Sequence, residues 1–184
     1  MTAASLLRYL AHAALAALLG AAAWILLRRA QLRSARLPAR FRAAPASPRR
    51  EALLLALAAY SAALLEIIAL RVGLGRSPRT LNLVPLETTL SQLRAGAWPF
   101  AYHTLGNLVW FAPLGALLAA LKPKLRARTA LAAGAAVSAA MELTQYLLAS
   151  GVTDVDDVWL NALGALSGWA LIRGWSALRR ARRS

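Results

Sequence analysis

The stretch TLGNLVWFAPLGALLAAL, residues 104–121, decides the fold class of this chain. It carries no charged side chain over 18 residues, and a helix needs roughly 20 mostly apolar residues to cross a hydrocarbon core. Four other segments have a similar length and composition: Leu6–Leu27, Ala52–Leu70, Thr129–Ala149 and Val158–Trp175. We therefore predict an all-α fold, a polytopic membrane helix bundle with about five transmembrane helices.

The overall composition favours a membrane protein over a soluble one. Hydrophobic residues make up 59% of the 184 residues, whereas soluble domains contain about 45–50%. The net charge of +15 would by itself also suit a nucleic-acid-binding protein. The arginines, however, lie between the apolar runs, where they orient a membrane protein and contact anionic lipid, so we expect no nucleic-acid partner. The absence of cysteine excludes disulfides and thiolate metal sites.

The basic residues predict the orientation of the chain. Residues 28–50 hold eight arginines, residues 122–128 hold four cations, and residues 173–184 hold five. Each of these segments is separated from the next by two predicted crossings, so all three lie on one side of the membrane. Because cations stay preferentially in the cytoplasm, we predict that the N-terminus is outside and the C-terminus is cytoplasmic.

The same features divide the chain into three parts. Residues 1–51 form an N-terminal transmembrane helix and a basic linker rich in proline and arginine, residues 52–175 form the helix bundle, and residues 176–184 form a basic cytoplasmic tail. Within the bundle part, a set of leucines after residue 82 falls on one helical stripe. This stripe predicts a short helix after Pro85 that lies in the outer interface. The residues of the stripe are Leu83, Leu86, Leu90 and Leu93.

Polar residues of four predicted helices meet at the outer membrane boundary in this topology. His103 and Asn107 are four residues apart and share a helical face, as do Asp157 and Asn161. Ionisable groups inside a membrane cost at least about 2.5–3.5 kcal/mol on insertion scales, and they therefore suggest a functional site. The predicted binding pocket consists of Glu66, Asn82, His103, Asn107, Glu142, Gln145, Asp154, Asp156, Asp157 and Asn161.

Several of these polar residues also have a purely structural interpretation. Asp154 or Thr153 can cap the last helix, and Asp156 and Asp157 are favoured by the dipole of the same helix. Glu66 can extend to the outer interface and pair with a nearby arginine. The spacing of Gly164 and Gly168 is typical of close packing between membrane helices.

Four short motifs resemble those of the VanZ-like family of bacterial membrane proteins. They are NLVPL (82–86), GNLVWFAPLG (106–115), ELTQ (142–145) and DVDDVWLNALG (154–164). The resemblance implies a location in the bacterial cytoplasmic membrane and, through the named member of the family, an association with resistance to the glycopeptide teicoplanin. Many members carry an arginine shortly before the acidic stretch. That arginine is absent here, where the corresponding segment is SGVTDVDD. Its role would then pass to another cation, with Arg71, Arg76 and Arg79 as candidates.

Two functions are compatible with these residues. The favoured one is a non-enzymatic protein of the cell envelope without a cofactor, whose polar pocket binds an envelope lipid, a peptidoglycan precursor or a partner helix, with a homo-oligomer as an option. The alternative is a membrane-embedded, metal-dependent hydrolase or transferase that acts on an envelope lipid. In that case Asp154, Asp156 and Asp157 would hold Mg²⁺ through carboxylate oxygens. The catalytic candidates, as general acids or bases, are Glu142, Asp157 and His103.

Overall fold

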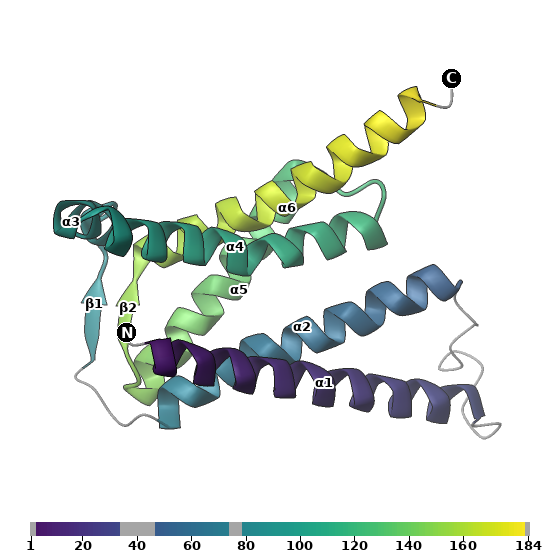
Figure 1. Cartoon of the computed structure of the whole chain (residues 1–184), viewed down its shortest axis with the longest axis horizontal. Helices are drawn as coiled ribbons and strands as arrows, with labels where there is room; N and C mark the ends of the chain where they lie inside the picture. Colours follow the sequence, from purple (N-terminus) through teal and green to yellow (C-terminus); the bar gives the residue numbers. More distant parts are fainter. Residues whose placement is uncertain (1–2, 34–46, 74–78, 183–184) are drawn as a thin grey trace. The chain divides into compact units, whose positions relative to one another are not determined.

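The chain folds into six helices and two short strands in the residues that the structure, a computed structural model, describes: 3–33, 47–73 and 79–182 (Figure 1). The chain divides into two compact units, Met1–Leu70 and Arg71–Ser184. The elements in chain order are α1 (Ala3–Arg33), α2 (Pro48–Gly73), β1 (Thr80–Asn82), α3 (Glu87–Ala95), α4 (Ala97–Leu121), α5 (Ala127–Leu148), β2 (Val152–Asp154) and α6 (Val155–Ala181).

Three of the described helices are long and apolar enough to cross a membrane. They contain Ala11–Gln31 of α1, all of α4 and all of α5. The prediction of a helical membrane protein is therefore confirmed, but the count by length and composition is three and not five. The other two long helices carry more polar residues, because α2 contains Glu51 and Glu66 and α6 begins with two aspartates.

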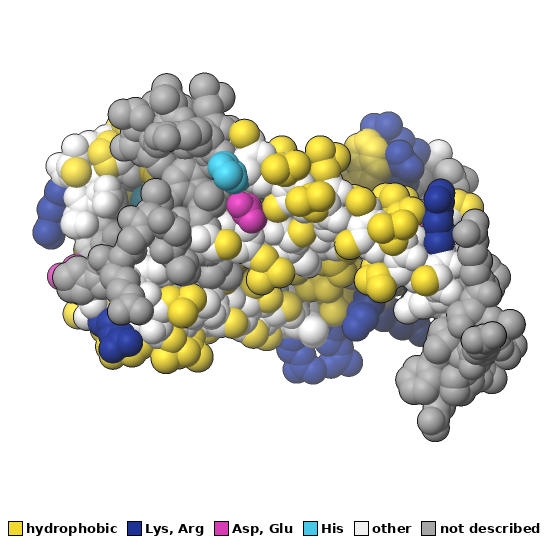
Figure 2. All heavy atoms as spheres, turned by 90° about the horizontal axis from the view of Figure 1, so that it is seen from below, with side chains coloured by type: hydrophobic (Ala, Val, Ile, Leu, Met, Phe, Trp, Pro, Cys, Tyr) yellow, Lys and Arg dark blue, Asp and Glu magenta, His cyan; other side chains and the backbone are white. Residues whose placement is uncertain are grey.

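Large apolar side chains remain exposed along the candidate spans. Leu18 of α1, Val109 of α4 and Leu147 of α5 are 69%, 68% and 60% exposed. Hydrophobic side chains accordingly cover much of the middle of the face shown in Figure 2. A soluble protein rarely exposes apolar patches of this extent, whereas lipid would cover them in a bilayer.

Helices α1 and α2 approach each other closely in the first unit. A Cβ atom placed on Gly20 would lie 2.5 Å from the Cβ of Ala62, so only glycine fits at this crossing. Arg28 donates two hydrogen bonds of 2.9 and 2.6 Å to the Glu51 carboxylate. This ion pair fixes the C-terminal part of α1 to the first turn of α2.

In the second unit, α6 packs between α4 and α5. Gly164 faces the backbone of Leu108, and Gly168 faces that of Ala112, where an added Cβ would lie 2.5 and 1.8 Å from the respective carbonyl oxygens. The close packing predicted from the glycine spacing is thus confirmed. On its other side α6 contacts Gly134 of α5, where an added Cβ would lie 2.7 Å from the Ala165 Cβ. Small residues therefore let three helix backbones come together.

Two features at the N-terminal ends of α4 and α6 complete the second unit. Strands β1 and β2 pair in parallel, with Asn82 opposite Asp154, a pairing that the sequence did not predict. The predicted short helix after Pro85 is present as α3, which lies across the end of α4 in Figure 1. Its leucines Leu90 and Leu93 are 45% and 52% exposed, and none of its residues is buried.

Candidate functional site

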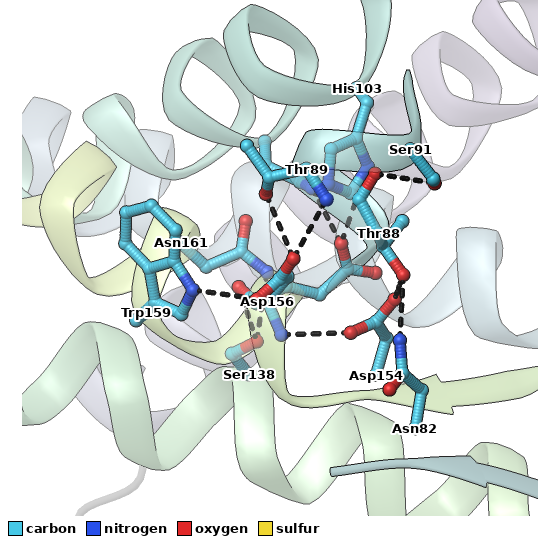
Figure 3. A network of polar contacts seen from close by, with 12 residues as sticks. Asn82, Thr88, Thr89, Ser91, His103, Ser138, Asp154, Asp156, Trp159 and Asn161 are labelled. Atoms are coloured by element: carbon cyan, nitrogen blue, oxygen red, sulfur yellow. Dashed lines mark hydrogen bonds and ion pairs between the residues drawn. The ribbon is translucent and has the colours of Figure 1, made fainter. Parts of the chain in front are cut away.

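The polar residues of the second unit form a hydrogen-bonded network where β1, β2, α3, α5 and the N-terminal ends of α4 and α6 meet (Figure 3). We call this network the polar cluster. Its members are Asn82, Thr88, Thr89, His103, Asn107, Ser138, Glu142, Asp154, Asp156, Asp157, Trp159 and Asn161.

The centre of the polar cluster is Asp156, whose side chain is fully buried. One carboxylate oxygen accepts from the Leu86 backbone N–H at 2.6 Å and from the Trp159 indole at 3.0 Å. The other accepts from the Thr89 backbone N–H at 2.8 Å and from the Thr89 hydroxyl at 2.9 Å. The carboxylate is therefore satisfied by four donors, three of them at the start of α3.

These contacts explain how α3 begins. Leu86, at the N-cap position, has a left-handed backbone with φ 66°, and its apolar side chain offers no cap. Asp156, from 70 residues further along the chain, supplies the missing acceptor, and its negative charge suits the N-terminal end of a helix. Burial raises the pKa of Asp156, but the hydrogen bonds from Thr89, Trp159 and Leu86 outweigh it, so the net pKa is lowered.

Asp154, the last residue of β2, links this strand to four other elements. It caps α6 by accepting from the Asp156 backbone N–H at 2.9 Å, as the structural interpretation of the sequence predicted. Its other carboxylate oxygen accepts from the Thr88 hydroxyl, which in turn accepts from the Asn82 side chain at 2.8 Å. The backbone N–H of Asp154 donates to the buried Glu142 carboxylate at 2.9 Å. Strands β1 and β2 and helices α3, α5 and α6 are thereby linked.

Glu142 and Gln145 hold the turn between α5 and β2. The Glu142 backbone carbonyl accepts from the Thr153 hydroxyl at 3.2 Å, and the Gln145 carbonyl accepts from the Ser150 N–H at 3.0 Å. Both side chains are buried, at 5% and 2% exposure. The Glu142 side chain, which accepts from the Asp154 backbone N–H, therefore connects α5 to the strand that follows it.

A second part of the polar cluster lies between α4, α5 and α6. The Asp157 carboxylate accepts from Asn107 at 2.7 Å and lies 3.8 Å from the Nδ1 atom of His103. The Asn161 amide donates to the Ser138 hydroxyl at 2.8 Å, and that hydroxyl donates to the Asp157 backbone carbonyl at 3.3 Å. The predicted convergence of His103, Asn107, Asp157 and Asn161 is thus present in the geometry.

Helices α4 and α6 also carry three buried polar atoms without a hydrogen-bond partner among the described residues: His103 Nε2, Thr104 Oγ1 and Asn161 Oδ1. His103 and Thr104 precede Asn107 by about one helical turn on α4, and Asn161 follows Asp157 by about one turn on α6. Leaving such a group unsatisfied costs about 1–3 kcal/mol. The network is therefore closed around Asp154 and Asp156 and incomplete around Asp157.

The four sequence motifs lie in a region that matches the sequence model of a known protein family. The sequence model of the VanZ/LLP1 family matches residues 52–178. The chain belongs to the VanZ/LLP1 family. Comparison with curated proteins and with solved structures gives no match. The matched region of this VanZ/LLP1 chain includes every member of the polar cluster.

One expectation about charged residues in this VanZ/LLP1 protein differs from the structure. Glu66 lies in the first unit, where its carboxylate is 3.3 Å from the Nδ1 atom of His12. Arg79 does not pair with the acids but donates to the carbonyls of Tyr146 and Leu147 at the end of α5, both at 3.3 Å. A cation suits that position because it faces the negative end of the helix dipole. The candidates Arg71 and Arg76 lie outside the described side chains.

The three aspartates do not form a joint metal site in the VanZ/LLP1 fold. Asp154, Asp156 and Asp157 direct their carboxylates to different donors on α3, α4 and their own helix. Over residues 3–33, 47–73 and 79–182, no group of three or more acidic, histidine or cysteine side chains converges as metal ligands. The set proposed for Mg²⁺ therefore does not fit that ion, which favours several oxygen ligands around one centre.

Four members of the polar cluster were not predicted from the sequence: Thr88, Thr89, Ser138 and Trp159. Ser138 lies four residues before Glu142, on the same face of α5, and this spacing was a usable signal. The threonines at the start of α3 had no such signal, because their partners come from β2 and α6.

Proposed function

We propose that this protein is a non-enzymatic membrane protein of the bacterial cell envelope, and that it binds an envelope component beside Asp157. The observation that carries the proposal is the group of buried atoms without partners on His103, Thr104 and Asn161. Buried polar groups are nearly always hydrogen-bonded, so a bound molecule would complete this part of the polar cluster. An envelope lipid, a peptidoglycan precursor or a partner helix would each supply polar groups there.

The unpartnered atoms indicate what chemistry such a ligand needs. The Asp157 carboxylate near His103 Nδ1 favours a proton on that nitrogen, which leaves Nε2 as an acceptor. Asn161 already donates through its amide nitrogen, which leaves its oxygen as a second acceptor. Two acceptors require donors such as hydroxyl or amide groups. The sugar and peptide parts of a peptidoglycan precursor carry such donors, whereas a fully ionised phosphate does not.

The proposal includes five crossings, with the N-terminus outside and the C-terminus in the cytoplasm. Helices α2 and α6 contain 26 and 27 residues; at 1.5 Å per residue each is about 40 Å long and exceeds a hydrocarbon core of about 30 Å. In this orientation the basic segments are cytoplasmic, and the polar cluster and α3 lie at the outer leaflet. Binding at this position would reduce the access of a glycopeptide such as teicoplanin to its target.

The proposal can be tested with purified full-length protein in detergent. Addition of a lipid-linked peptidoglycan precursor should raise the melting temperature of the wild type. His103→Ala and Asn161→Leu should reduce that rise, because each removes one unpartnered acceptor. Ser167→Ala is the matched control on α6, since its hydroxyl donates only to the Gly164 carbonyl of its own helix, at 2.7 Å. An equal rise in all four proteins, or no rise in any of them, would contradict the proposal.

One observation favours a second candidate, the membrane-embedded hydrolase or transferase acting on an envelope lipid. A carboxylate beside an imidazole, as in Asp157 and His103, is an arrangement used in general base catalysis. This candidate predicts turnover of the lipid-linked precursor by purified protein, with loss of turnover in Asp157→Asn. If EDTA also abolishes turnover, the metal-dependent form is supported; if no product forms, the binding function remains the better account.

A further inference from the structure

The last turns of α6 extend past the loop that joins α4 to α5 (Figure 1). The Trp169 indole and the Arg173 guanidinium both donate to the Leu125 carbonyl at 3.0 Å, and Arg173 also donates to the Lys122 carbonyl at 3.3 Å. Just beyond these bonds, a Cβ placed on Gly174 would meet nothing within 4 Å. The packed part of α6 therefore ends near Arg173, and the following two turns lie outside it.

These last turns are strongly basic and carry exposed apolar side chains. Leu171, Trp175 and Leu178 are 70%, 57% and 60% exposed, and their spacing of four and three residues places them on one face. The Arg179 guanidinium lies 4.9 Å from the centre of the Trp175 ring, and the exposed Arg180 follows it. The sequence has no acidic residue after Asp157 that would neutralise these charges.

We propose that this end of α6 is a binding site for an anionic phospholipid, in which Arg179 and Arg180 hold the phosphate and Trp175 lies at headgroup level. A tryptophan with an apolar body and a polar N–H is favoured at that depth, and Leu171 and Leu178 would contact the acyl chains. Arginine suits the phosphate because its planar fork donates two parallel hydrogen bonds. The charge of the segment commits the site to an anionic lipid over a zwitterionic one. The site is separate from the polar cluster, which lies at the opposite end of α6.

The test uses full-length protein and native mass spectrometry in detergent, with phosphatidylglycerol and phosphatidylcholine of matched chains as probes. Arg179→Gln/Arg180→Gln should weaken phosphatidylglycerol binding by about 25-fold, because each basic residue near an anionic surface contributes about fivefold. Phosphatidylcholine binding should change little. Trp175→Ala, which keeps both charges, should weaken binding of both lipids.

The matched control is Lys122→Gln/Lys124→Gln, which removes the same charge from exposed positions of the neighbouring loop. This control should leave phosphatidylglycerol binding within about twofold of the wild type. An equal loss in both double variants would show general charge attraction and overturn the proposal, as would equal affinity for the two lipids. An unchanged melting temperature in all variants establishes that the differences reflect binding and not unfolding.

Discussion

Replacement of Asp156 by asparagine changes one atom at the centre of the polar cluster and should strongly destabilise the second unit. In the wild type, each carboxylate oxygen accepts two hydrogen bonds. In Asp156→Asn, the amide oxygen still accepts from one pair of donors, but the amide nitrogen faces the other pair. The Thr89 hydroxyl can rotate and accept from it, whereas the Thr89 backbone N–H cannot and loses its acceptor.

The magnitude follows from these bonds. A buried donor left without an acceptor costs about 1–3 kcal/mol, and each of two remaining bonds becomes weaker by about 1 kcal/mol because its acceptor is no longer charged. We therefore expect the free energy of unfolding to fall by about 3 kcal/mol or more. Glu87→Gln is the matched control, because Glu87 belongs to the first turn of α3, where the Asp156 carboxylate also binds, but its own side chain is exposed. This substitution should change the free energy of unfolding by less than about 0.5 kcal/mol.

The assay is reversible unfolding of the full-length protein in mixed micelles by SDS titration, followed by circular dichroism. Hydrogen exchange then locates the effect, since the amides of α3 should exchange faster in Asp156→Asn than in wild type or Glu87→Gln. The reasoning is refuted if Asp156→Asn loses less than about 1 kcal/mol, the value of a single ordinary hydrogen bond, or if α3 retains its protection.

Two further predictions concern pH and helix packing. The pKa of Asp156 is lower in the folded protein than the usual 3.8, so the stability that its carboxylate contributes is complete above about pH 4 and is lost as the pH falls through the lowered pKa. When unfolding is measured at decreasing pH, the free energy of unfolding should therefore fall more steeply for wild type than for Asp156→Asn. Parallel curves for the two proteins would contradict this prediction. Gly168→Ala should be destabilising, since its Cβ would lie 1.8 Å from the Ala112 carbonyl oxygen, whereas Gly106→Ala, whose Cβ meets nothing within 4 Å, should be neutral or slightly stabilising. Thermal melting of both variants checks this, and equal melting temperatures would show that α4 and α6 do not pack through Gly168.

The sequence by itself determined the class of this protein and one close helix contact, at Gly164 and Gly168. Hydropathy predicts membrane helices because it is summed over neighbouring residues of one segment. The long apolar run of α4 can therefore be identified without knowing which segments pack against it. The spacing of Gly164 and Gly168 predicts close packing for a similar reason, because helical periodicity places both on one face. The motifs that resemble the VanZ-like family lie within the region that the VanZ/LLP1 family matches.

The partners of the polar residues were decided only by the tertiary structure. Asp156 was interpreted as a residue favoured by its own helix, yet it caps α3, which lies 70 residues earlier. Arg79 was a candidate partner of the acids, yet it binds the end of α5. A carboxylate or guanidinium can satisfy its hydrogen bonds with many groups, and its choice depends on which segments the packing of α4, α5 and α6 brings within about 3 Å. Such a choice is a property of pairs of distant segments, whereas hydropathy and periodicity are properties of one segment.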